Sequence, residues 1–309
     1  MARYVAKRFL LMIPTLVGVA ALIFFLMRVV PGDVVELRFS GESSFASKQQ
    51  LDQERARFGL DRPLWRQFVE WMWGLARFDF GRSMWTGAPI SEEIRLRFML
   101  SLELAILATI VAVLLAIPLG VIAALKQDTW VDYAVRIFSL AGIATPSFWL
   151  GIILIYVFSI QLGWLPSARM GGPAHYVLPT ITLAAFLVAG MMRLVRSSVL
   201  EILDTEYVKL ARIKGLSQTV VIWKHCLRNA LIPVVTLFGV FFALLVTGAI
   251  VTETVFAWPG VGRLTYEAVI FRDYPLLQAV ILMKGIIVLG VNLGVDILYA
   301  YLDPRVRYS

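Results

Sequence analysis

Two polar residues inside an apolar stretch near the end of the chain are the first candidates for chemistry. Asn292 and Asp296 lie one helical turn apart, so in a helix they share one polar face. Lys284 lies about 18 Å from Asp296 along such a helix and cannot pair with it directly. In a membrane, the polar face could line a solute path or contact a partner subunit. The alternative is a structural tie to an arginine or a backbone N–H, which the position of Asp296 near the inner end of the stretch favours.

The sequence offers little for catalysis or for metal binding. Its two histidines, His175 and His225, fall in different predicted compartments, and its one cysteine, Cys226, excludes an intrachain disulfide. The phosphate-binding pattern G-x-x-x-x-G-K-[ST] and the zinc pattern H-E-x-x-H do not occur. We therefore expect a chain that is not an enzyme and that binds no cofactor or metal of its own.

A basic segment at residues 193–229 carries the clearest local signals. Thr205, or the aspartate before it, can cap a helix, and the carboxylate of Glu206 complements the positive end of that helix. Gly215 suits the left-handed conformation that ends many helices, and Ser217 can cap a second helix that continues into the next apolar stretch. The segment therefore predicts two helices joined by a sharp turn.

One face of the first of these helices is partly apolar. Tyr207, Leu210, Ala211 and Lys214 share this face by helical spacing. The face could pack against the helix ends of the chain itself, or it could fit a groove on a partner. The spacing alone favours packing.

The composition indicates that lipid is the solvent for much of the chain. Hydrophobic residues make up 59% of the sequence and charged residues only 16%, against about 25% charged residues in soluble domains. A soluble fold could not bury that much apolar surface. The net charge of +8 is compatible with nucleic acid or with anionic lipid, and the positions of the basic residues favour lipid.

Six apolar stretches are long enough to cross a bilayer, which needs about 17–25 residues in a helix. Backbone groups in lipid must be satisfied within each segment, so we expect helices, and the alternating pattern of a β-barrel is missing. The stretches are Phe9–Met27, the segment between Glu103 and Lys126, the segment from after Arg136 to about Ile160, the segment between His175 and Arg193, the segment between Arg228 and Glu253, and about Leu277–Leu302. The first could be a signal peptide, but its length and the lack of a small-residue cleavage site favour a spanning helix.

Basic residues are concentrated in alternate short loops, which predicts the orientation. The loops predicted to lie inside contain Arg3, Lys7, Arg8, Lys126, Arg136, Arg193, Arg196, Lys209, Arg212, Lys214, Lys224, Arg228, Arg305 and Arg307. The short loops on the other side contain only Arg169, Arg263 and Arg272. Both termini should therefore be cytoplasmic, with Cys226 a free thiol in the reducing compartment.

The long loop after the first stretch is predicted to lie outside. Within it, Pro63–Ala76 has the spacing of an amphipathic helix, and four tryptophans lie in or near this segment. They could form an interfacial belt or a docking platform for an external partner, and the belt is the favoured interpretation. The predicted division is a first membrane helix at 1–30, an outer loop at 31–100 and a five-helix core at 101–309.

Twelve different short motifs are distributed along the whole chain. They are Ile13-Pro14, Pro31-Gly32-Asp33, Phe58-Gly59-Leu60-Asp61-x-Pro63, Asp79-Phe80-Gly81-x-Ser83, Pro146-Ser147-Phe148-Trp149-Leu150-Gly151, Gly163-Trp164-Leu165-Pro166, Tyr207-Val208 with Ala211-Arg212-x-Lys214-Gly215, His225-x-x-Arg228-Asn229-Ala230-x-Ile232-Pro233, Glu253-x-Val255-Phe256-x-Trp258-Pro259-Gly260-x-Gly262, Arg272-Asp273-Tyr274-Pro275, Asn292-Leu293-x-Val295-Asp296-x-Leu298-Tyr299 and Asp303-Pro304-Arg305-x-Arg307-Tyr308. In this order they resemble the inner-membrane permeases of ABC importers, specifically the dipeptide/oligopeptide (peptide/nickel) family. Ala211 and Gly215 match the Ala and Gly of the "EAA" loop of such permeases, whereas Lys209 and Leu210 replace its first two letters.

The resemblance implies an all-α type I importer permease with six transmembrane helices in the cytoplasmic (inner) membrane of a prokaryote. Its expected partners are a second homologous permease, two ATPase subunits that bind ATP and Mg²⁺, an extracytoplasmic solute-binding protein, and a peptide or similar solute, but no nucleic acid. It also raises the docking interpretation of the basic segment above packing. The residues expected to couple to the ATPase are Glu206, Tyr207, Leu210, Ala211, Lys214, Gly215, Leu216 and Ser217.

Two other functions remain as alternatives. A stand-alone secondary transporter would use the charged residues in its spans, Asp296 and Lys284, to bind coupling ions, and it would transport without an ATPase. A membrane-embedded enzyme would need a cluster of catalytic groups on one side of the membrane, which the sequence does not show.

Overall fold

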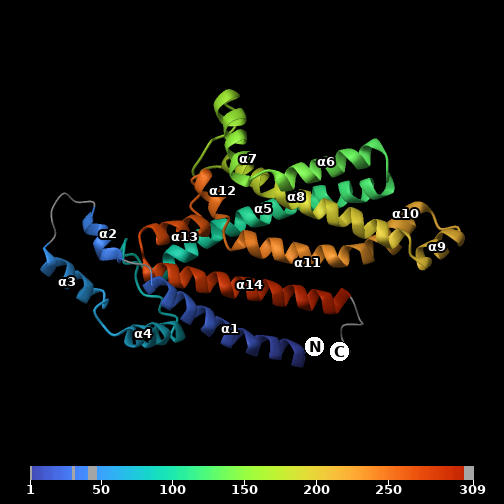
Figure 1. Cartoon of the computed structure of the whole chain (residues 1–309). Helices are drawn as coiled ribbons and strands as arrows, with labels where there is room; N and C mark the ends of the chain where they lie inside the picture. The colour runs from blue at the N-terminus through green and yellow to red at the C-terminus, as the bar shows by residue number, and fades with distance from the viewer. Residues whose placement is uncertain (1, 30–31, 41–46, 303–309) are drawn as a thin grey trace. The chain divides into compact units, whose positions relative to one another are not determined.

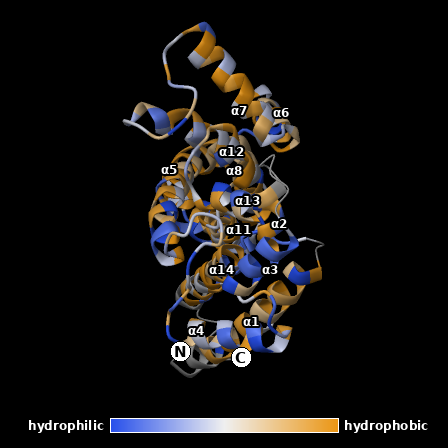
Figure 2. Cartoon of the chain, turned by 90° about the vertical axis from the view of Figure 1, so that its left-hand side faces the viewer, coloured by the Kyte–Doolittle hydropathy of each residue, from blue (hydrophilic) through white to orange (hydrophobic). Residues whose placement is uncertain are grey.

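A computed structural model describes residues 2–29, 32–40 and 47–302 of the chain (Figure 1). Over these ranges the chain is helical and contains no β-strand, and apolar residues run along the long helices (Figure 2). The helices, in chain order, are α1 (Ala2–Val29), α2 (Val34–Ser40), α3 (Lys48–Arg57), α4 (Leu64–Ala76), α5 (Ile90–Leu125), α6 (Trp130–Ala144), α7 (Ser147–Leu154), the π-helix η1 (Ile155–Gln161), α8 (Ala174–Leu203), α9 (Glu206–Ile213), α10 (Gln218–Val220), the π-helix η2 (Val221–Cys226), α11 (Leu227–Val246), α12 (Ile250–Val255), α13 (Val261–Ile270) and α14 (Tyr274–Leu302).

Five described helical segments are long and apolar enough to cross a membrane. They are Arg8–Val29, Ile90–Leu125, Ala174–Leu203, Gln218–Val255 and Tyr274–Leu298. A sixth is obtained when α6 and the α7–η1 segment are counted as one span. The structure therefore supports five or six spans, in agreement with the predicted number.

The third predicted span is broken, which corrects the expectation of one continuous helix. Its two parts meet at an angle of 101° between Ala144 and Ser147. Pro146 lacks an N–H and disfavours helical geometry in the residue before it. Thr145 accordingly adopts an extended conformation, with φ −80° and ψ 120°. Pro146 was the available signal for this break, but the apolar residues around it led to the prediction of one continuous span.

The chain divides into two compact units. Unit 1 comprises residues 1–100 and 259–289, and unit 2 comprises residues 101–258 and 290–309. The three-part division expected from the sequence is defined by the membrane rather than by internal contacts, so it stays a prediction.

In unit 2, α8 is the central helix and packs against both α6 and α11. The approach to α6 is close: a Cβ added to Gly142 would lie 2.7 Å from the Cβ of Ala189, so only glycine fits there. The hydroxyl of Ser139 donates a 2.5 Å hydrogen bond to the carbonyl of the same Ala189. These contacts fix α6 and α8 as an antiparallel pair, as Figure 1 shows.

In unit 1, the predicted amphipathic helix is confirmed as α4, with Pro63 at its N-cap position. Its apolar face packs against α1, where the fully buried ring of Phe24 lies 5.1 Å from Phe68 and 5.8 Å from Trp71. Trp65 and Trp73 lie on the exposed side of α4. The tryptophans therefore divide between internal packing and an exposed surface.

Candidate functional site

The segment between α8 and α11 folds into a sharp corner, residues 204–229, which we name the α9 corner (Figure 1). Helix α9 ends at Ile213, and Gly215, two residues later, has a φ of +79°. The N–H of Gly215 donates to the carbonyl of Arg212 (3.0 Å), and the N–H of Leu216 donates to that of Ala211 (3.3 Å). This pair of bonds is the Schellman arrangement, so the predicted glycine-terminated helix is confirmed.

The beginnings of the two short helices differ in detail from the prediction. Thr205 and Ser217 occupy the N-cap positions of α9 and α10 with extended backbones, but neither side chain caps its helix. The hydroxyl of Thr205 instead donates to the carbonyl of Ile202, at 2.6 Å. The second helix also changes character, because it passes through the π-helix η2 before α11 begins. Single π-helical turns within longer helices often occur at functional sites.

One side of α9 is buried within the chain. Val208 and Ala211 form a small core with Val221 of η2, against which Ile202 and Leu203 pack. Ala211 therefore lies on the buried side of α9. The prediction that it shares an exposed face with Leu210 is wrong. The reason is that the inner face of α9 follows the three-residue spacing of Val208 and Ala211. That spacing was available in the sequence but was not assigned to packing.

Tyr207 joins the corner to the next membrane helix. Its hydroxyl accepts a hydrogen bond from the side-chain amide of Asn229 (2.8 Å) and donates a longer one to the carbonyl of His225 (3.4 Å). Asn229 lies in the first turn of α11. The contact links α9 to the start of a membrane-spanning helix across 22 residues of sequence.

The opposite side of α9 is exposed and partly apolar. Leu210 is 54% exposed and Ile213 is 80% exposed. Leu216 and Trp223 elsewhere in the corner are also exposed, and Lys214 adds an exposed positive charge. Glu206 is also exposed and pairs with Lys209 at 3.1 Å. Sequence reasoning missed Ile213, although it follows Leu210 at helical spacing.

The polar pair in the last helix lies on the part of α14 that belongs to unit 2. Asn292 is exposed and Asp296 is half-buried. The neighbouring Val295 fits against Gly239 of α11, where any added Cβ would overlap its side chain. The α14 segment is therefore packed on α11 at the level of the polar pair.

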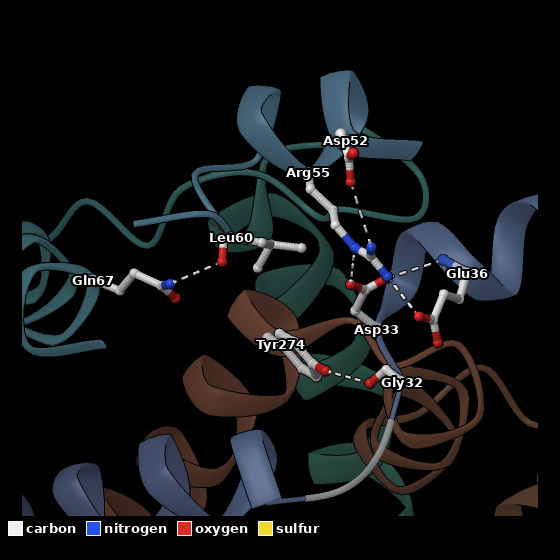
Figure 3. A network of polar contacts seen from close by, with 8 residues as sticks. All are labelled: Gly32, Asp33, Glu36, Asp52, Arg55, Leu60, Gln67 and Tyr274. Atoms are coloured by element: carbon white, nitrogen blue, oxygen red, sulfur yellow. Dashed lines mark hydrogen bonds and ion pairs between the residues drawn. The ribbon is translucent and has the colours of Figure 1, made fainter. Parts of the chain in front are cut away.

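In unit 1, a network of polar contacts holds the start of the outer loop (Figure 3). Arg55 of α3 forms ion pairs with Asp33 (2.7 Å) and Glu36 (2.5 Å). The hydrogen bond to Asp33 raises the pKa of Arg55 above its ordinary value, and the charges of both acids add to this effect. The hydroxyl of Tyr274 donates to the carbonyl of Gly32, at 2.9 Å.

A second set of contacts in unit 1 joins two of the signature motifs. The hydroxyl of Ser83 donates a 2.5 Å hydrogen bond to the buried carboxylate of Asp273, which also accepts from the backbone N–H groups of Met84 and Trp85, each at 3.2 Å. The ring of Trp85 stacks on Phe271 with centroids 4.3 Å apart. Residues 83–85 of this loop are therefore attached to the chain just before α14.

No group of three or more His, Cys, Asp and Glu side chains that could hold a metal ion occurs in the described parts of the chain. The arrangement that stands out chemically is the α9 corner: a rigid turn with an exposed apolar and basic face.

The model of the family described as the binding-protein-dependent transport system inner membrane component matches residues 116–308. A second model, for the N-terminal part of such components, matches residues 1–90. The chain belongs to this family. The permease is 43% identical over 309 residues to the glutathione transport system permease protein GsiC of Escherichia coli (strain K12) and of Shigella dysenteriae serotype 1 (strain Sd197). The whole of each chain is covered.

Solved structures confirm the fold. An inward-facing form of the MetNI methionine ABC transporter matches with a TM-score of 0.58 at 18% identity, covering 70% of the permease and 98% of that chain. A crystal structure of an amino acid ABC transporter with histidines matches with a TM-score of 0.53 at 14% identity, covering 68% and 94%. The predicted all-α importer permease fold is thus confirmed. The chain is a multi-pass inner-membrane permease subunit of an ABC importer, not an ATPase.

Proposed function

We propose that this permease pairs with a second, homologous permease to form the path for a peptide-like solute, and that the α9 corner docks one of two ATPase subunits. The exposed apolar face at Leu210 and Ile213 carries this proposal. A loop beside the membrane has no internal reason to expose such a face, because burial of apolar surface is favourable. A groove on a partner subunit would cover it.

The chain's internal contacts supply a route for the motion. Closure of an ATPase dimer upon ATP binding would displace α9, and the bond from Asn229 to Tyr207 would pass that displacement to α11. Alternating access requires that the partners contact the corner differently in the two states. The ATPase subunits, not this chain, would bind ATP and Mg²⁺.

The solute is proposed to be a small peptide, with glutathione as the first candidate. The support is the full-length similarity to permeases named for glutathione transport. Specificity is expected to lie largely in an extracytoplasmic solute-binding protein. A direct test is uptake of labelled glutathione and labelled Ala-Ala into proteoliposomes that contain both permeases, the ATPases and the binding protein. Uptake that continues without the ATPases would support a secondary transporter and refute the proposal.

The proposed orientation places both termini and the α9 corner, within the loop at 193–229, in the cytoplasm. Cys226 is buried and is therefore a poor labelling site, so the test needs introduced cysteines. In a Cys226→Ala background, a cysteine replacing the exposed Thr219 should react with impermeant maleimide only in inverted vesicles. A cysteine replacing the exposed Lys48 should react in intact cells. The reverse pattern would overturn the orientation.

A further inference from the structure

Three arginines line a groove between α6 and α8. Its lining includes Arg136, Arg193 and Arg196 together with Ile137 and Leu140, and its volume is about 460 Å³. None of these residues belongs to the α9 corner or to the polar pair of α14. The groove lies wholly within unit 2.

Two contacts between α6 and α8 set the register of the pair and therefore the positions of the arginines along the helix axes. Arg196 pairs with Asp132 through both carboxylate oxygens, at 2.5 and 2.7 Å, and Ser139 bonds Ala189 deeper in the pair. Starting from the ion pair, Arg136 lies about 6 Å further along α6 and Arg193 about 4.5 Å further back along α8. Because the helices are antiparallel, both displacements point the same way, and the two side chains start at nearly the same depth.

Only one of the three arginines has its charge compensated by a direct ion pair. Asp132 is fully buried and bonds Arg196, and Asp128 lies near the same guanidinium. Arg136 lies over the ring of Tyr133 at 5.4 Å. Within the described residues, neither Arg136 nor Arg193 forms an ion pair with an acid. The groove therefore has an excess of positive charge inside a segment that is long and apolar enough to span a membrane.

The rest of the lining is apolar and faces outward. Ile137 is 69% exposed and Leu140 is 67% exposed, and both follow Arg136 along α6 in the direction of the membrane interior. A free phosphate ion would satisfy the arginines but would leave this surface uncovered. An occupant with an anionic head and an apolar tail matches both parts of the groove.

We propose that the groove between α6 and α8 binds an anionic phospholipid, with its phosphate between Arg136 and Arg193 and its acyl chains along Ile137 and Leu140. Basic pockets between membrane helices suit such headgroups because the lipid supplies the missing negative charge. Arg196 is held by Asp132 and acts as a fixed wall of the site. The lipid would hold α6 to α8 just before the break that leads into α7.

The test uses the purified complex of both permeases and the ATPases in mild detergent. Phosphatidylglycerol or phosphatidylcholine with identical acyl chains is added, and retained lipid is counted by native mass spectrometry. The double variant Arg136→Gln/Arg193→Gln is compared with Lys48→Gln/Lys126→Gln, which removes two exposed charges elsewhere. Each basic residue near an anionic lipid contributes about a fivefold factor in affinity. We therefore expect about 25-fold weaker retention of phosphatidylglycerol in the arginine variant and an unchanged value in the lysine variant.

Four results would overturn the proposal. Equal retention of phosphatidylglycerol by the arginine variant and the parent would show that the groove is not the site. If the arginine variant lost phosphatidylcholine to the same extent as phosphatidylglycerol, the cause would be damage to the helix pair rather than loss of a headgroup contact. Full displacement of the lipid by millimolar inorganic phosphate would assign the groove to a free anion. If the arginine variant instead loses the second permease while it retains lipid, the groove is a protein interface.

Discussion

The side-chain amide of Asn229 lies 2.8 Å from the hydroxyl of Tyr207, and this bond connects α9 to the first turn of α11. Both residues lie in segments that resemble permease signatures, and the structure gives a reason for their pairing. Together with the packing of Val208 and Ala211 on Val221 of η2, this bond is the proposed route by which a displacement of α9 would reach a membrane helix.

Removing the Tyr207 hydroxyl should weaken coupling more than it weakens the fold. In Tyr207→Phe the ring remains, and the lost hydrogen bond contributes about 0.5–1.5 kcal/mol. We expect a small change in thermal unfolding of the complex and a clear fall in substrate-stimulated ATPase activity. Tyr266→Phe, at another exposed tyrosine, is the matched control. Normal stimulation in Tyr207→Phe would show that the bond does not transmit motion.

Substitutions at Gly215 should separate backbone strain from crowding. A Cβ at this position would meet no atom within 4 Å, so the cost comes from the left-handed backbone alone. This cost is about 1–2 kcal/mol for most residues and smaller for asparagine. Gly215→Val should therefore impair the coupling of ATP hydrolysis to uptake, and Gly215→Asn should retain most of it. If Gly215→Val transports normally with full substrate-stimulated ATPase activity, the assignment of the corner is wrong.

Polar substitutions on the two sides of α9 should have different effects: one should reduce ATPase binding and the other should reduce folding. Ile213→Ser changes an exposed residue, so the permease should fold normally but retain less ATPase during purification. Val208→Ser changes a fully buried residue and should lower the folded yield, because an unsatisfied buried hydroxyl costs about 1–3 kcal/mol. Retention of the ATPase is measured by quantitative gel analysis after affinity purification. Full retention by Ile213→Ser would argue against docking at this face.

Asp273→Asn should loosen the outer loop. From the loop, the carboxylate accepts bonds from the Ser83 hydroxyl and from the backbone N–H groups of Met84 and Trp85, and each bond to a charged group contributes about 1.5–3 kcal/mol. Trypsin should then cut faster after Arg77 and Arg82, which precede the attached segment. Asp61→Asn removes the same charge from an exposed position and should leave the rate unchanged. Equal cleavage rates in both variants would show that the contact is dispensable.

Asp296 should matter for assembly rather than for cargo choice. Asp296→Asn keeps the hydrogen-bonding capacity and should preserve some transport. Asp296→Leu should reduce co-purification of the second permease with the ATPases. Asn292→Leu, one turn away and exposed, shows how much of any effect comes from the shared face. An intact Asp296→Leu complex with altered cargo preference would place the residue in the solute path.

Local features of this fold could be predicted because they depend on short stretches of sequence. Long apolar runs predict the membrane helices, and Gly215 predicts the end of α9. The break at Thr145 and Pro146 was missed, although a proline inside an apolar run is a signal for a helix boundary. Contacts between distant residues, such as Asp132 with Arg196, depend on tertiary register, which no short pattern contains. The exposure of Ile213 also could not be predicted, since spacing does not say which face of a short helix is covered.

The bond between Ser83 and Asp273 has a consequence for biosynthesis. The partners are 190 residues apart in the chain, and ribosomes add about 5–20 residues per second. About 10–40 seconds therefore pass between the synthesis of Ser83 and the synthesis of its partner Asp273. During this interval Trp85 has no Phe271 on which to stack. Unit 1 thus begins with the first helix to enter the membrane and can be completed only when the last helix follows.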